Sequence, residues 1–183
     1  MQPQPSLSAR RKRLPPFHEI LSFYAVIVFL VYSWTLLAFF WKVPSWRYYL
    51  GAGDILVILA YTLASKLLES MLILCIFLLA GFVLPAGWLS NKFVVHGSLV
   101  IFSFTFWVTL FDLNSVAHSL TQQDVLSFMF GFPLMATLGI LLADRTPLVH
   151  KLMVFVGNQL IVFLYLWLPL SLVGILIVIL RIL

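Results

Sequence analysis

The sequence predicts an all-α, polytopic integral membrane protein: a bundle of about five transmembrane helices with a cytoplasmic N-terminus. Of its 183 residues, 63% are hydrophobic and 9% are charged, whereas about a quarter of the residues in soluble domains are charged. Several continuous apolar runs exceed the roughly 18 residues that indicate a membrane-spanning helix. Because these runs do not alternate with polar residues, they exclude a transmembrane barrel. We expect one bundle over residues 20–183 and no separate soluble domain.

Residues 1–19 are predicted to form a disordered, basic cytoplasmic tail, because they contain too few apolar side chains to pack. Four basic residues stand together at 10–13, directly before the first membrane helix. Such a cluster marks the cytoplasmic side and contacts anionic lipid. This cluster accounts for much of the net charge of +5, so the charge does not indicate a nucleic-acid partner.

The first helix is predicted at 20–41, an apolar run that ends in aromatic residues. It is longer than the apolar part of a signal peptide and lacks a small-residue cleavage site, so we expect an uncleaved anchor. Pro44 and Gly51 are predicted to break the helical structure. Tryptophan and tyrosine alternate with basic residues around them, which favours an interfacial segment over 42–53.

The run at 54–84 has a lysine and a glutamate near its middle, and it crosses the membrane either once or as a hairpin over 51–84. Residues 63–70 lack Gly, Pro, Asn and Asp, the residues that favour turns. Each half of a hairpin would reach only about 22 Å, against about 30 Å of hydrocarbon. A single pass also places most basic residues inside, whereas a hairpin, which gives six helices, divides them almost evenly. We therefore expect one long helix.

Three further helices and two interfacial segments complete the predicted bundle. The helices cover 93–111, 125–143 and 158–180, and the interfacial segments cover 112–124 and 148–156. Within the first of these segments, apolar residues recur at steps of three and four, which indicates an amphipathic helix on the outer interface. Pro169 is predicted to bend the last helix, and the C-terminus is expected outside.

The strongest candidate for a functional site is a polar face on the second helix. At 100° per residue, its members lie within about 140° of arc. They are Tyr61, Thr62, Ser65, Lys66 and Glu69. A charge at the centre of a membrane helix costs about 2.5 to 3.5 kcal/mol. This face is therefore expected to point into protein or water, either as a binding site or as a pair that only neutralises itself.

Two weaker constellations concern metals and catalysis. His96 and His150 are both predicted near the cytoplasmic face, where they suit either haem ligation or, more simply, hydrogen bonds to headgroups. Asp112, His118 and Asp124 could form an outer metal or catalytic site, although the aspartates are better explained as helix N-caps. The sequence contains none of the common nucleotide, zinc-protease or nucleophile motifs. We expect no cofactor, no metal and no catalytic residue.

Three functions from different classes remain open on the sequence. The first is a non-enzymatic accessory, scaffold or assembly subunit of a larger membrane complex. The second is a small transporter or channel that uses Lys66 and Glu69. The third is a membrane-embedded lipid-modifying or redox enzyme. We favour the first, with membrane lipids, other integral membrane subunits or further copies of the chain as partners, in a plasma or inner membrane.

Overall fold

The computed structural model describes residues 15–83, 92–117 and 121–182, and within these ranges all regular structure is helical. The elements are α1 (Phe17–Trp46), α2 (Ala52–Val83), α4 (Phe93–Ala117), α5 (Gln122–Arg145) and α6 (Pro147–Ile182). All five are long and apolar enough to cross a membrane, which confirms the predicted fold class. The predicted tail up to residue 14, the turn near Pro85 and residue 118 lie outside the described residues.

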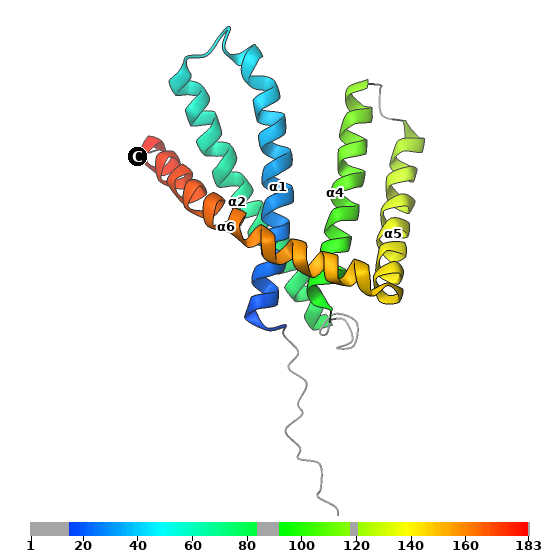
Figure 1. Ribbon diagram of the computed structural model, residues 1–183. Helices are drawn as coiled ribbons and strands as arrows, with labels where there is room; N and C mark the ends of the chain where they lie inside the picture. Colours follow the sequence, from blue (N-terminus) through cyan, green and yellow to red (C-terminus); the bar gives the residue numbers. More distant parts are fainter. Residues whose placement is uncertain (1–14, 84–91, 118–120, 183) are drawn as a thin grey trace, which may run out of the picture.

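The helices form two antiparallel pairs, α1 with α2 and α4 with α5, and α6 runs obliquely across both pairs (Figure 1). Helix α6 contacts all four of the other described helices, and α1 contacts α2, α4 and α6. Helices α1 and α4 end, and α2 and α5 begin, at one end of the bundle, whereas α1, α4 and α6 begin at the other (Figure 1). Helix α1 is therefore the centre of the fold, and α6 joins the two pairs.

Helix α2 is a single helix of 32 residues, so the hairpin alternative is excluded. The stretch around Lys66 continues the helix without a turn. This agrees with its lack of turn residues and with its strong helix formers.

The helix ends differ from the expected ones at the first connection. Helix α1 begins at Phe17, within the predicted tail, and continues through Pro44 to Trp46. The expected interfacial segment 42–53 is thereby reduced to a turn at 47–51. Pro44 lies in the last turn of the helix, and although it removes one intrahelical hydrogen bond, the helix continues for two more residues.

The segment expected at the outer interface, 112–124, is also divided between two longer helices. Its first half continues α4 to Ala117. Thr121 is the N-cap of α5 and forms a capping box with Asp124, whose Oδ2 accepts a hydrogen bond from the Thr121 backbone nitrogen at 2.9 Å. Asp124 is therefore the third residue of its helix, and Asp112 lies inside α4, so neither aspartate is an N-cap.

The second expected interfacial segment, 148–156, is part of α6, which continues for 36 residues without a break. At 1.5 Å per residue this helix is about 54 Å long, so it can cross about 30 Å of hydrocarbon only when strongly tilted. Gly157 is a contact point and not a break: a Cβ there would lie 3.4 Å from Val94 Cγ1. The oblique course of α6 therefore accounts for its excess length.

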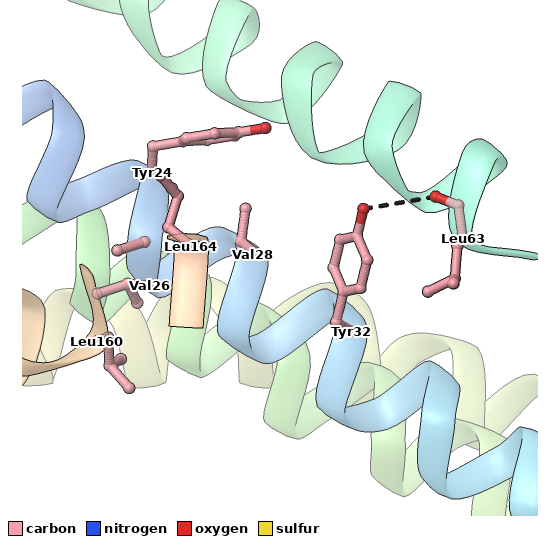
Figure 2. Packing of buried hydrophobic residues seen from close by; sticks show 8 residues of the cluster. Tyr24, Val26, Val28, Tyr32, Leu63, Leu160 and Leu164 are labelled. Atoms are coloured by element: carbon pink, nitrogen blue, oxygen red, sulfur yellow. Dashed lines mark hydrogen bonds between the residues drawn. The ribbon is translucent and has the colours of Figure 1, made fainter. Parts of the chain in front are cut away.

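The core lies where α1 meets α2 and α6, and polar groups hold the helices together inside it (Figure 2). The Tyr32 hydroxyl lies 2.7 Å from Ser171 Oγ of α6 and also donates to the Leu63 carbonyl of α2 at 3.4 Å. The Tyr24 hydroxyl lies 3.2 Å from Ser70 Oγ. In a membrane, where apolar burial hardly drives helix association, such bonds and close packing fix the arrangement.

Removal of the Tyr32 hydroxyl should destabilise the bundle, because Ser171 and the Leu63 carbonyl both lose a partner in an apolar setting. For Tyr32→Phe we expect a loss of about 1 to 2 kcal/mol in the free energy of unfolding, measured by titration of mixed micelles with a denaturing detergent. Tyr48→Phe is the matched control, since Tyr48 is 84% exposed. Equal stability of the two variants would contradict this role of Tyr32.

Helices α2 and α6 approach closely at Gly174, where a Cβ would lie 2.9 Å from the Ala60 carbonyl oxygen. Since this neighbour is backbone, it cannot move aside as a side chain would. We expect Gly174→Ala to push the helices apart and to cost about 1 to 3 kcal/mol. The same detergent titration should show no loss for Gly53→Ala, where a Cβ meets nothing within 4 Å.

Candidate functional site

The predicted ion pair of α2 is present. Lys66 Nζ and Glu69 Oε2 lie 2.5 Å apart, and the side chains remain 29% and 47% exposed. Both residues lie near the middle of the 32-residue helix. In a bilayer, this depth is the most costly one for a charge that meets hydrocarbon.

Lys66 lies between two adjoining cavities. The first, of about 100 Å³, is lined by α1, α2 and α4, and the second, of about 270 Å³, by α1 and α2. They share Trp34, Thr35 and Lys66, and we call the two together the Lys66 groove. Its hydroxyl and charged side chains are Thr35, Lys42, Thr62, Lys66, Glu69, Thr105 and Thr109.

The Lys66 groove opens on the face of α1 and α2 that α6 leaves uncovered. All the residues that line it come from α1, α2 and α4. Helix α6 meets α2 on a different side, where Ala60 and Leu63 are buried. Helix α6 also contacts α1. It therefore covers one face of the α1–α2 pair, and the groove lies on another face of this pair, which stays open.

The five polar residues of α2 have different positions relative to the groove. Thr62, Lys66 and Glu69 line the groove, whereas Tyr61 and Ser65 are exposed on the outside of the bundle. Ser65 donates to the Thr62 carbonyl at 2.9 Å. A hydroxyl that bonds to its own helix in this way can face lipid at little cost.

Apolar side chains close one end of the groove. Ile27, Ile73 and Ile101 line its wall there, and behind them the ring of Phe23 lies 5.0 Å from both Phe77 and Phe93. Because interiors of this kind are tightly packed, water and ions do not pass this end in the observed arrangement. The groove is thus a recess, open at its side.

The two candidate histidines among the described residues, His96 and His150, lie in different surroundings. Asp144 Oδ1 forms an ion pair with Lys92 and lies 3.3 Å from His96 Nε2, so this cluster ties the start of α4 to the end of α5. His150 instead lines a separate cavity at the start of α6. Within residues 15–83, 92–117 and 121–182, no group of three or more His, Cys, Asp or Glu is placed to hold a metal ion.

Sequence reasoning missed the groove residues outside α2. Thr105 and Thr109 are four apart and so share one face of α4, a spacing that marks them as a pair. No pattern in the chain indicates that this face and Thr35 meet Lys66.

Comparisons of the chain with known protein families, with curated proteins and with solved structures find no match. The five apolar helices indicate a multi-pass integral membrane protein. The Lys66 groove offers hydroxyls, the ammonium groups of Lys42 and Lys66, and one carboxylate, which is already paired with Lys66. These are groups for binding by hydrogen bonds in a membrane.

Proposed function

We propose that this protein is a non-enzymatic accessory subunit that binds a transmembrane helix of another membrane protein in the Lys66 groove. The observation that carries the proposal is the exposure of the ion pair: Glu69 is 47% exposed at the middle of a membrane-length helix. Contact of such groups with hydrocarbon is costly. A polar helix seated in the groove removes this cost.

The chemistry of the groove defines the partner. Lys66 and Glu69 neutralise each other, so the groove around them needs hydrogen bonds more than an opposite charge. Lys42, the other charged residue of the groove, lies near the end of α1. Thr105 and Thr109 present hydroxyls opposite the pair. We therefore expect the bound helix to carry Asn, Gln, Ser or Thr at the depth of Lys66, since these side chains bridge membrane helices.

A small transporter or channel that uses the same pair is the second candidate. It is supported by the position of Lys66 and Glu69 in a cavity between three helices. It requires the closed end to open, which means separating Ile27 and Ile101 from the phenylalanine cluster around Phe23. The accessory role needs no such rearrangement.

Purification of the tagged chain from its own membrane in mild detergent separates the two candidates. The accessory role predicts one partner at fixed stoichiometry, which is lost from the Lys66→Leu/Glu69→Leu variant while the amount of purified chain stays the same. Recovery of the chain alone, together with substrate-dependent flux in vesicles, would instead support the transporter.

We also propose a cytoplasmic N-terminus in a plasma or inner membrane, on the basis of the basic residues 10–13. In a Cys75→Ser background, single cysteines at positions 48 and 122 are expected to react with an impermeant maleimide added outside intact cells. A cysteine at 145, from the opposite end of the bundle (Figure 1), should react only after permeabilisation. Labelling of position 145 in intact cells would contradict this orientation.

A further inference from the structure

The part of the Lys66 groove nearest the end of α1 carries positive charge that no carboxylate balances. Among the described residues, the cavity between α1 and α2 is lined by the ammonium groups of Lys42 and Lys66 and by no acidic side chain. Lys66 is paired with Glu69, whereas Lys42 forms no ion pair with any residue that the structure describes. Asp54 and Asp124, at the same end of the bundle, are each held by a backbone nitrogen. The groove therefore has one net positive charge, located at Lys42.

The groove has the length and the periodicity of a surface that holds a helix. Its lining residues on α1 recur at steps of one, three and four from Ile27 to Trp46, a spacing that keeps them on one side of α1. This side extends over about 28 Å at 1.5 Å per residue. A helix that crosses about 30 Å of hydrocarbon can therefore lie along the whole groove.

Lys42 lies on the same side of α1 as Thr35, seven residues further along. Thr35 lines both cavities together with Lys66, whereas Lys42 lines only the cavity nearer the end of α1. Seven residues are two helical turns, or about 10 Å. A helix that meets Lys66 and continues along the groove consequently passes Lys42, and its own residues seven apart share one face.

The ammonium of Lys42 is accessible to such a helix, because the residue is exposed. When a helix covers this ammonium, the group loses contact with water and headgroups. A carboxylate on the covering helix compensates this loss through a charge-assisted hydrogen bond.

We propose that the helix bound in the Lys66 groove carries an aspartate or glutamate that pairs with Lys42. This inference rests on the proposed function and adds a rule for the partner's sequence. The acidic residue lies about seven positions from the polar residue that meets Lys66, on the same face of the bound helix. It lies toward the end of the bundle where α1 ends.

This pairing sets the direction of the bound helix. Lys66 and Glu69 lie near the middle of α2 and contact the middle of the partner in either direction. In the reversed direction, the acidic side chain would meet the apolar wall of Ile27, Ile73 and Ile101. Since a carboxylate in apolar surroundings is costly, Lys42 selects one of the two directions.

Binding of synthetic membrane helices to the full purified chain in mild detergent tests the inference. The probe is a leucine-rich peptide of about 22 residues with one central asparagine and a dansyl group. Energy transfer to the dansyl group from the tryptophans of the chain, of which Trp34 and Trp46 line the groove, reports binding. A glutamate seven residues from the asparagine should lower the dissociation constant roughly tenfold relative to glutamine there. A glutamate five residues away, on another face of the peptide, should give no gain.

Exchange of the charges supplies the second arm of the test. Lys42→Glu should abolish the gain from glutamate and instead favour a peptide with lysine at that position. The matched control is Arg47→Glu, because Arg47 is exposed near the same end of α1 but does not line the groove. This control should retain the preference for glutamate.

Equal binding of the glutamate and glutamine peptides to the parent chain would overturn the inference, even if Lys42→Glu fails to fold. The proposed function would still stand if both peptides bind more tightly than one in which leucine replaces the asparagine. If the asparagine gives no gain either, the proposed function fails as well. Loss of the glutamate preference on addition of phosphatidylglycerol would assign Lys42 to lipid headgroups and would also overturn the inference.

Discussion

Replacement of Lys66 and Glu69 together by leucine is expected to give a protein that inserts and folds at normal levels but no longer holds its partner. The double change removes both charges and therefore the cost of keeping them in a membrane. Each single leucine variant leaves one charge without its partner, at a cost on the order of 3 kcal/mol. In measurements on the same preparations, the folded yield should thus be normal for the double variant and reduced for each single variant, whereas the partner should be lost from the double variant despite its normal yield.

The double variant distinguishes binding from mere neutralisation. If the pair only neutralises itself, the double variant will keep its partner and its function as well as the parent does. The matched control is Tyr61→Leu with Ser65→Leu, which changes two exposed polar residues of the same helix that do not line the groove. This control is expected to fold normally and to retain the partner.

A bulky side chain placed in the groove should have an effect of similar size. Thr105→Trp fills the recess of about 100 Å³ opposite Lys66 and Glu69. Because the recess is open at its side, the part of the indole that does not fit can project through the opening without displacing neighbouring side chains. We therefore expect a folded protein whose groove is blocked and which has lost its partner. Co-purification checks this, with Thr137→Trp on the exposed side of α5 as the control. A partner retained at full stoichiometry by Thr105→Trp would place the binding surface elsewhere.

The number of helices and the single pass of α2 follow from features that act within one stretch of chain. Apolar runs of sufficient length indicate membrane helices, and the absence of turn residues around Lys66 indicates a continuous helix. The spacing of Lys66 and Glu69 likewise defines their pairing, since residues three apart are neighbours on a helix. These predictions are confirmed.

Features that depend on how the helices pack could not be predicted from the sequence. Periodicity shows that Tyr61, Ser65 and Lys66 share one side of α2, but it does not show how much of that side a neighbouring helix covers. The oblique course of α6 decides this, because α6 covers Leu63 and leaves Lys66 open. Pro44 and Gly157 show the same limit of sequence-based prediction. Each residue type is compatible with a helix break, but the observed helices continue through both positions.

Site-specific photo-crosslinking in the native membrane tests the central claim most directly. A photoreactive phenylalanine at Trp34 or Thr109 lies in the Lys66 groove, whereas one at Tyr165 lies on an exposed face of α6. Both groove positions are predicted to form a crosslink to the same single membrane protein, which disappears in the Lys66→Leu/Glu69→Leu background, while position 165 forms none. Crosslinks to lipid alone from the groove, or the same protein captured equally from position 165, would contradict the assignment of this groove as a helix-binding site.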